Sequence, residues 1–348
     1  MTRFSPSVLI LSVLAFGSCS SAFAEDAPSA PNATTGSKPA TAAIATNTPA
    51  ASTDPLEVEF QKILKLDDEA HEAAQAILDE VANAKDPLTA PLPITTRARI
   101  DARVGPVRKA YEEFLKQNPG YTRAHMAFAS FLSDTGNEAE AVEHYETART
   151  QNPKDPAAWN NLANIYAHSG PVEKAFPYYE EAIRLKPDES LYLHNFGTLI
   201  FLFRKDAKTY FKCDDAGAFS RALELYRKAI ELDPKNFTLA SDVAQTYYGI
   251  PRTPGKSAEE SRIEEANLIH TAMKSWTNVY QLAPGDVERE GIRLHLARWN
   301  IRASRFADAR THLNAITNAT YLEVKKRLER DLASKESLTA PTAPAPAK

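Results

Sequence analysis

The sequence predicts an all-α solenoid of about five helix-turn-helix repeats with capping helices at both ends. Three observations predict it. Apolar residues recur at three- and four-residue spacing through residues 156–187, as on one face of a helix. Pro119, Pro153 and Pro187 follow one another at a constant interval of 34 residues. Only 12 of the 348 residues are Gly, while Ala, Leu, Glu and Lys are frequent, and this composition favours helix.

Residues 156–187 are predicted to form two short helices joined by a turn. Asp155 is suited to cap the first helix, and Gly170 is suited to end it. Ala163 and Ala175 are small and lie where the two helices must come close. Because one helix pair cannot bury its own apolar face, neighbouring pairs have to stack. The same stripe occurs one period earlier, in Phe128, Ala129, Leu132, Gly136, Ala141, Tyr145 and Ala148.

This pattern resembles the tetratricopeptide repeat, whose signature places Trp, Leu, Gly, Tyr, Ala, Phe and Pro at set positions in a repeat of 34 residues. Trp159, Leu162 and Tyr166 match the signature, whereas Ala163 replaces its Gly and Tyr179 replaces its Phe. The repeats that we expect lie at residues 121–153, 156–187, 190–234, 237–284 and 287–316.

The third and fourth repeats are longer than the period, so they contain insertions near residues 204–216 and 249–265. In this family, insertions usually lie in loops on one face of the stack. Pro177 falls inside the second helix of the 156–187 repeat. There we expect it to remove a hydrogen bond and to kink the helix.

Residues 199–203 are apolar on all sides, which predicts a helix that is covered on two sides. We expect the first insertion, with Tyr210 and Phe211, to fold over Phe201 and Leu202 and to narrow the groove. The alternative is an apolar ligand pocket at the same place.

Helices are also predicted outside the repeats. Residues 56–84 and 97–117 each carry an apolar stripe but fit the period poorly, so we expect them to form an opening pair that caps the stack. A dimerising coiled coil is the alternative, although it needs a longer heptad run. Residues 321–334 are rich in Lys, Arg and Glu, which suits a polar end cap. The repeat domain is therefore expected to span residues 55–334.

Residues 1–24 are typical of a secretory signal peptide, with Arg3 before a short apolar run and an Ala-Phe-Ala cleavage pattern at the end. Cys19 offers an alternative, because its surroundings partly resemble a lipoprotein processing site that would leave a lipid anchor. Residues 25–54 and 335–348 are rich in Ala, Thr, Ser and Pro, and we expect both to be disordered. We expect the protein to be exported, and to be periplasmic or associated with the outer membrane of a bacterium.

Composition and motifs argue against several classes of function. The formal net charge is −4, and Lys and Arg are not clustered, so nothing suggests a nucleic-acid surface. No nucleophile-elbow, P-loop or dinucleotide-binding motif occurs, and the 8 His residues show no zinc-ligand spacing. Cys213 is the only Cys besides Cys19, so no disulfide framework is expected. We therefore expect neither an enzyme nor a bound metal or cofactor.

The family resemblance implies where a ligand would lie, because in this family the first helix of each pair lines a concave groove. Amide side chains in the groove could hydrogen-bond a peptide backbone, since an amide both donates and accepts. The alternative is that each is an ordinary solvated residue. The Lys residues with which some family members clamp a terminal carboxylate are missing beside Asn160 and Asn164. The groove residues that the resemblance implies are Asn160, Asn164, His168, His194, Thr198, Phe201, Ser241, Gln245, Tyr248, Arg298 and Arg302.

These expectations together indicate a non-enzymatic scaffold of the bacterial envelope that binds a peptide or a partner protein in its groove. Contact with a membrane is expected only through a lipid anchor at Cys19. Two other classes stay open. The protein could bind a small ligand, or assist an enzyme, through an apolar pocket around Phe201. It could also be a structural module that self-associates through its end helices.

Overall fold

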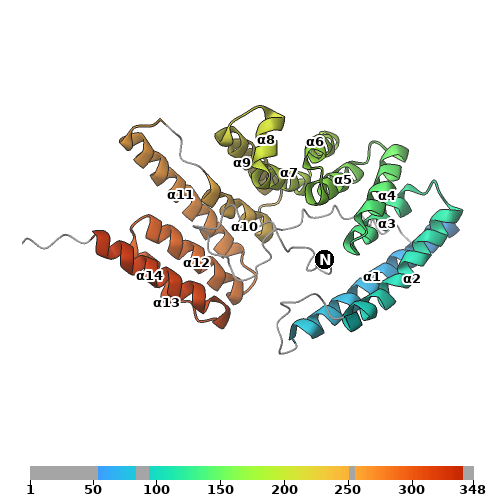
Figure 1. The fold of residues 1–348 in the computed structure, drawn as a ribbon, viewed down its shortest axis with the longest axis horizontal. Coiled ribbons are helices and arrows are strands. Elements are labelled where there is room, and N and C mark those ends of the chain that lie inside the picture. The colour runs from blue at the N-terminus through green and yellow to red at the C-terminus, as the bar shows by residue number, and fades with distance from the viewer. Residues whose placement is uncertain (1–53, 84–93, 251–254, 340–348) are drawn as a thin grey trace, which may run out of the picture. The chain divides into compact units, whose positions relative to one another are not determined.

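The computed structural model describes residues 54–83, 94–250 and 255–339. These ranges consist of α-helices, short 3₁₀-helices and turns, and no strand occurs within them (Figure 1). The all-α fold class predicted from the sequence is therefore confirmed. By their internal contacts the described residues form two compact units, 54–195 and 196–339.

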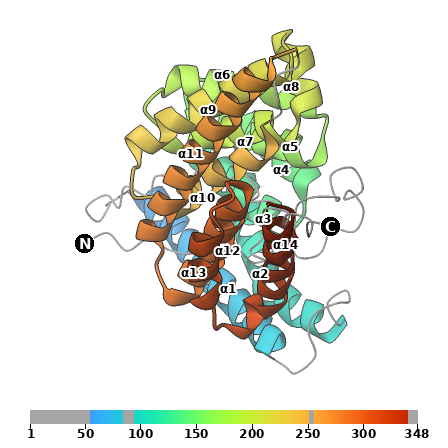
Figure 2. The same ribbon diagram turned by 90° about the vertical axis from the view of Figure 1, so that its left-hand side faces the viewer.

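The first unit contains three helix hairpins and the beginning of α7. The long helices α1 and α2 lie side by side (Figures 1 and 2), and the pairs α3–α4 and α5–α6 pack in the same way. The expected repeats at 121–153 and 156–187 contain these two pairs. The elements of this unit are α1 (Pro55–Asn83), α2 (Ile94–Gln117), α3 (Thr122–Asp134), α4 (Glu138–Gln151), α5 (Pro156–Ser169), η2 (Val172–Lys174), α6 (Ala175–Leu185) and the first part of α7 (Ser190–Leu202).

Local sequence explains how α5 begins and ends. The Asp155 carboxylate accepts a hydrogen bond of 3.0 Å from the backbone N–H of Ala157, so it satisfies one of the free donors of the first turn. Gly170 follows the helix with φ 68°, a conformation that a residue without a Cβ adopts at little cost. Ala163 and Ala175 are both fully buried, as expected of small residues between two close helices.

Pro177 does not interrupt α6, contrary to our expectation. A 3₁₀ turn, η2, precedes the helix, and α6 starts at Ala175, so Pro177 is its third residue. The N–H groups of the first turn have no acceptor inside the helix, and a proline there removes no helical hydrogen bond. Pro106, which we did not single out in the sequence, lies within α2, where a proline does remove one.

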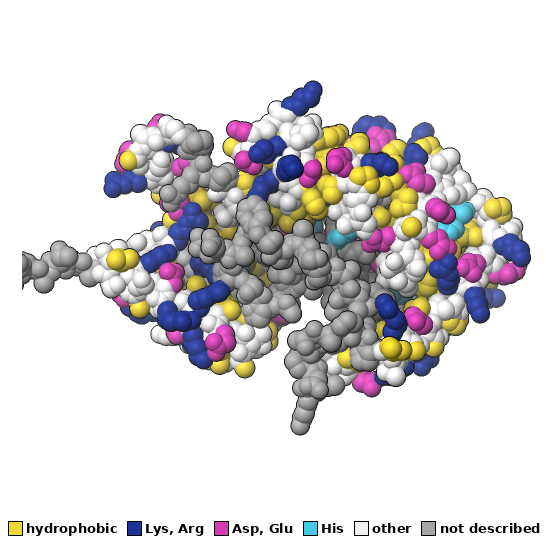
Figure 3. All heavy atoms as spheres, viewed as in Figure 1, with side chains coloured by type: hydrophobic (Ala, Val, Ile, Leu, Met, Phe, Trp, Pro, Cys, Tyr) yellow, Lys and Arg dark blue, Asp and Glu magenta, His cyan; other side chains and the backbone are white. Residues whose placement is uncertain are grey.

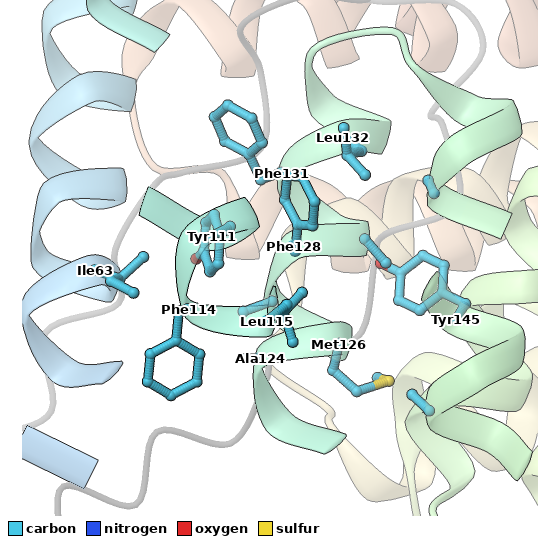
Figure 4. Close-up of a cluster of buried hydrophobic side chains, with 14 of the residues drawn as sticks. Ile63, Tyr111, Phe114, Leu115, Ala124, Met126, Phe128, Phe131, Leu132 and Tyr145 are labelled. Atoms are coloured by element: carbon cyan, nitrogen blue, oxygen red, sulfur yellow. The ribbon is translucent and has the colours of Figure 1, made fainter. Parts of the chain in front are cut away.

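The core of the first unit is aromatic where α2, α3 and α4 meet. Tyr111 stacks on Phe128 with 5.2 Å between the ring centroids, and Phe131 approaches Tyr111 at 6.0 Å. Figure 4 shows these three rings in one cluster, with Tyr145 of α4 nearby. Rings of this size remove much apolar surface from water, so they carry a large part of the hydrophobic stabilisation.

The second unit continues α7 and ends in three helices, α12, α13 and α14, that lie side by side in Figures 1 and 2. Each of these three helices contacts the other two, and together they enclose one apolar cluster. The elements that follow α7 are α8 (Arg204–Phe211), α9 (Asp215–Leu232), α10 (Phe237–Thr246), η3 (Tyr247–Gly249), α11 (Ala258–Leu282), α12 (Asp286–Arg302), α13 (Phe306–Asn314), η4 (Ala319–Tyr321) and α14 (Leu322–Thr339).

Both insertions contribute helix where loops were expected. The first forms the short helix α8, and the second supplies the N-terminal part of α11. Ser257 and Glu260 make a complete capping box at the start of α11, in which the Ser257 hydroxyl accepts from the Glu260 N–H at 3.2 Å. This box explains why the helix begins so early, because it satisfies donors that would otherwise be unpaired.

The first insertion does not cover the apolar run as we expected. Phe211 lies against Phe196, at 6.2 Å between centroids, and under the guanidinium of Arg221. Phe201 packs instead on Phe219, at 5.9 Å. Leu202 remains 54% exposed. The predicted cover over Leu202 was wrong, because α8 places Phe211 against Phe196, which precedes the run.

The C-terminal helix is longer than predicted, because α14 continues to Thr339 where an end at Ser334 was expected. Among the described helices, none has an apolar stretch of the length that a bilayer crossing needs. The expected signal peptide, with Cys19, lies outside the described residues, as do nearly all of the expected linker and the last part of the expected tail.

Candidate functional site

The residues expected to line a groove fall on first helices of the hairpins in both units. In the first unit they are on α5 and at the start of α7, and in the second unit they are on the rest of α7, α10, η3 and α12. Their surroundings differ between the units. An amide network dominates the first unit, whereas rings and guanidinium groups dominate the second.

Asn160 takes part in a chain of hydrogen bonds that links three helices of the first unit. Its Nδ2 donates to the Asn161 Oδ1 at 3.1 Å, and its Oδ1 accepts from the Asn195 Nδ2, also at 3.1 Å. Asn161 in turn donates to the Tyr145 hydroxyl at 3.2 Å. The chain therefore runs from α4 through α5 to α7.

Asn164 extends this network by one turn. Its Oδ1 accepts from the Tyr179 hydroxyl at 2.5 Å and from the Asn195 Nδ2 at 3.4 Å. Burial raises the pKa of Tyr179 well above its usual value, so the phenol keeps its proton and remains a donor. Asn161, Asn195 and the two tyrosines were not among the expected site residues. The adjacent Asn160 and Asn161, and a further Asn one repeat later, are the signal that could have found them.

The two predicted amides are buried rather than solvated. Asn160 is 0% exposed and Asn164 is 4% exposed. A buried amide is costly unless it is hydrogen-bonded, and the partners described above satisfy this requirement. His168 and His194 are half-buried on the same two helices, and they lie closer to solvent than the amides. The amides therefore fix the positions of α5 and α7.

Tyr248 is the centre of an aromatic cluster in the second unit. Its ring stacks on Trp299 at 4.9 Å, and its hydroxyl lies 3.1 Å from His295 Nδ1. The His295 ring is parallel to Trp276, with 3.8 Å between centroids and 4° between planes. Burial, with a smaller contribution from the charge of Arg298, lowers the pKa of His295 to about 3, so this ring is neutral at pH 7.

The two predicted arginines flank this cluster. Arg298 lies over the Tyr248 ring at 5.6 Å, and burial lowers its pKa. Arg302 lies over Trp299 at 4.9 Å and holds Glu265 of α11 through two hydrogen bonds of 2.6 and 2.9 Å. Glu265 was not among the predicted site residues, because it lies in the second insertion.

The remaining predicted residues vary in exposure. The Ser241 hydroxyl donates to the Phe237 carbonyl, and the Thr198 hydroxyl accepts from Tyr226 at 3.0 Å. Phe201 packs on Phe219, so the structure shows ring packing where a ligand pocket was the alternative. Gln245 is exposed. In the described ranges, no three His, Cys, Asp or Glu side chains form a group that could hold a metal ion.

Comparison with known proteins identifies the family. A family model for the tetratricopeptide repeat matches residues 132–190. The chain is 31% identical over 131 residues to the photosystem I assembly protein Ycf3 of Synechococcus sp. (strain WH7803), across 36% of this chain and 76% of that protein. The chain belongs to the tetratricopeptide repeat family. In the terms of this family, α5 and α7 are the first helices of consecutive repeats, so the amide network joins two repeats.

Other similar proteins are matched over a smaller share of their length or at lower identity. Hsp70-Hsp90 organizing protein 2 of Arabidopsis thaliana is 33% identical over 104 residues, which are 30% of this chain and only 16% of that protein. Among solved structures, pilF of Pseudomonas aeruginosa has a TM-score of 0.46 at 15% identity, across 68% of this chain and 91% of that chain. At this level of identity the likeness concerns the fold alone.

Proposed function

We propose that this tetratricopeptide repeat protein is a non-enzymatic adaptor that binds a protein partner through first-helix residues of each unit, namely His168 and His194 in the first and Gln245 and Arg298 in the second. The observation that carries the proposal is the amide network between α5 and α7. Apolar side chains could also pack these helices together, but apolar contacts are not directional and do not require specific donor and acceptor pairs. The hydrogen bonds among these buried amides hold the helices in one arrangement.

A fixed arrangement matters for binding because association costs entropy. A surface whose helices and side chains are ordered before the partner arrives loses less freedom on binding. The aromatic cluster has the same effect in the second unit, where the stacked rings hold Arg298 in place. Arg and aromatic side chains are also the residue types most enriched among energetically important interface contacts.

The names of the relatives support this class of function. One relative is named for organizing Hsp70 and Hsp90, and another for the assembly of photosystem I. Both names describe proteins that act on other proteins. For this chain we propose the same general role, with a partner that the fold does not identify.

The location that we propose is the bacterial envelope, on the basis of residues 1–24. Membrane fractionation of the wild type and a Cys19→Ser variant distinguishes the two processing routes. If Cys19 carries a lipid, the wild type sediments with membranes and the variant does not. If the chain is cut after Ala24, both forms are found in the periplasmic extract. Export fails as a proposal if both forms stay uncleaved in the cytoplasm.

Site-specific photo-crosslinking tests the binding surface. A photoreactive amino acid is placed at Gln245, at His194 or at Ser220, and the crosslinked proteins of the source cell are identified by mass spectrometry. Ser220 is the matched control, because it is exposed like Gln245 but lies on α9, a second helix. We expect one protein to crosslink at Gln245 and His194 and not at Ser220. Equal crosslinking at the three positions, or none, would contradict the proposal.

A further inference from the structure

A cavity of about 200 Å³ lies among the last hairpins of the second unit. Three helices supply its walls, and the exposed Thr277 shows that it reaches the surface. The cavity is lined by Met273, Thr277 and Tyr280 of α11, by Arg293 and Leu296 of α12, and by His312 of α13.

This cavity lies on a different side of α12 from His295 and Arg298. Each residue of an α-helix turns about 100° from the one before. Arg293 and Leu296 therefore share one side of α12, while His295 and Arg298 point to the opposite side. None of the residues that line the cavity is among those of the proposed binding surface.

The size of the cavity restricts what it can hold. Pockets for drug-sized ligands usually enclose about 300–1,000 Å³. A volume of about 200 Å³ is smaller and suits one large side chain. The side chains of Met273 and Leu296 and the ring of Tyr280 make its walls apolar. Methionine is flexible and polarisable, and it is common at surfaces that adapt to several side chains.

Two nitrogen-bearing side chains line the cavity and keep free donor or acceptor capacity. Arg293 stacks on Tyr280 and donates to its hydroxyl at 2.7 Å, but it makes no ion pair within the described residues. His312 Nδ1 is buried and has no hydrogen-bond partner in the described part of the chain. Burial and the charge of Arg293 lower the pKa of His312, against the opposing charge of Asp308. A buried polar atom without a partner suggests that a bound group completes the site.

The rim of the cavity is basic. The Nη1 of Arg305 lies 3.7 Å from the Met273 sulfur, which places a second guanidinium beside the opening. None of the six lining residues is acidic. Figure 3 shows several Lys and Arg side chains over α12 to α14, the segment to which Arg305 belongs. Complementary charge favours a partner with a carboxylate at this rim.

We propose that this cavity is a docking site for a segment of a partner protein that inserts one Leu, Met or Phe side chain and places an Asp or Glu beside it. The apolar side chain fills the space between Met273 and Leu296. The carboxylate lies near Arg293 and Arg305. Burying one such anchor in a fitted pocket is how a few residues come to dominate the affinity of an interface.

A pair of threonine variants tests the pocket. Thr277 and Thr271 are both exposed on α11, and each hydroxyl donates at 2.8 Å to the carbonyl four residues before it. Only Thr277 lines the cavity. Thr277→Trp therefore fills the cavity, whereas Thr271→Trp adds the same bulk elsewhere. Equal melting temperatures by circular dichroism will show that both variants are folded.

A random dodecapeptide library displayed on phage is selected against the mature wild-type chain. We expect enrichment of peptides in which a large apolar residue stands next to Asp or Glu. Fluorescence anisotropy with the enriched peptides should show at least about tenfold weaker binding to Thr277→Trp and unchanged binding to Thr271→Trp. Peptides without this pair of residues, no enrichment, or equal affinity for both variants would overturn the proposal.

A second comparison tests the charge. Changing the acidic residue of an enriched peptide to its amide should weaken binding to the wild type about fivefold. The same change in the peptide should have little effect on its binding to the Arg305→Gln variant. It should weaken binding to the Arg262→Gln variant, in which an exposed arginine of α11 is replaced, as much as it weakens binding to the wild type. A fivefold loss in all three proteins would refute the role of Arg305. This outcome is independent of the crosslinking at Gln245 and His194.

Discussion

Two histidines, one in each unit, differ in charge at pH 7, because His71 is protonated and His295 is neutral. In the first unit, His71 Nδ1 lies 2.8 Å from the Asp67 carboxylate, and its Nε2 lies 3.9 Å from Asp134. In the second unit, His295 lies flat against Trp276 and faces the hydroxyl of Tyr248. Burial alone would lower the pKa of His71, but the hydrogen bond and charge of Asp67, with the charge of Asp134, raise it to about 9. The pKa of His295 is lowered to about 3.

The difference shows that burial does not decide the charge of a packed histidine. Both rings lose water, which disfavours the imidazolium in both. At His71, two carboxylates outweigh the effect of burial and raise the pKa. At His295, the neighbours are aromatic rings and a guanidinium, so nothing opposes the lowering of the pKa by burial. The two units should therefore respond to pH in opposite directions.

The largest effect is expected in acid, in the second unit. The folded-state pKa of His295 is about 3 and its unfolded value is 6.5, so between these values the unfolded state binds more protons. This contribution to stability is present above pH 6.5 and is lost as the pH falls toward 3. From pH 7 to pH 3 we expect a loss of about 4 kcal/mol in the free energy of unfolding.

Urea unfolding followed by the fluorescence of Trp276 and Trp299 measures this loss, in a Trp159→Phe background that removes the signal of the first unit. Other groups also titrate in acid, so His295→Gln serves as the reference. The free energy of unfolding is plotted against pH for both proteins, and the difference between their slopes gives the contribution of His295. Identical slopes would show that this histidine titrates normally in the folded protein.

The next largest effect is expected in alkali, in the first unit. The pKa of His71 is raised in the folded state, so its contribution is complete below pH 6.5 and is lost as the pH rises through about 9. From pH 6 to pH 9.5 we expect a loss of about 3 kcal/mol. Replacement of His71 by Gln, which cannot titrate, should reduce the dependence of the free energy of unfolding on pH in this range. NMR titration of the ring protons measures the pKa directly, and a value near 6.5 would contradict the comparison.

The repeat pattern could be predicted from the sequence because it is local. The residues that make α3 to α6 helical are their own periodic apolar positions, and caps such as Asp155 lie next to the helix that they stabilise. The insertions carry no such period, so α8 and the early start of α11 were not predicted. Pro177 was misjudged because its effect depends on where the helix begins, which the preceding 3₁₀ turn decides.

The positions of the candidate site could be predicted, but their environment could not. Period and resemblance place Asn160 and Tyr248 on first helices. Whether each faces solvent depends on partners from other helices, such as Asn195 of the next repeat, 35 positions along the chain. His295 was missed for the same reason, since Tyr248 lies 47 positions away. Such pairings arise only when the hairpins stack.

Two glycines extend the comparison of the units to packing. A Cβ on Gly197 of α7 would lie 2.9 Å from the ring of the buried Tyr226 and 3.3 Å from the Ala222 carbonyl. Apart from its chain neighbours and its own helix backbone, a Cβ on Gly105 of α2 would meet nothing within 4 Å. We expect Gly197→Ala to destabilise the second unit by about 2 kcal/mol through overpacking. Gly105→Ala should change the stability of the first unit by less than about 1 kcal/mol, because the helix propensity of alanine is opposed by crowding between its Cβ and the ring of Pro106. Urea unfolding that shows equal losses for the two variants would refute this contrast.

The smallest effect concerns the two tyrosines that face the histidine networks. The Tyr111 hydroxyl donates to the Asp67 carboxylate at 2.8 Å, a charge-assisted bond, whereas the Tyr248 hydroxyl meets the neutral ring of His295 at 3.1 Å. Bonds to a charged group contribute about twice as much as neutral ones. We expect Tyr111→Phe to cost about 2 kcal/mol and Tyr248→Phe about 1 kcal/mol in urea unfolding at pH 7. At pH 9.5 His71 has lost its proton, so Asp67 depends more on Tyr111, and the cost of Tyr111→Phe should not fall. A larger cost for Tyr248→Phe would mean that the neutral network, not the charged one, is the stronger of the two.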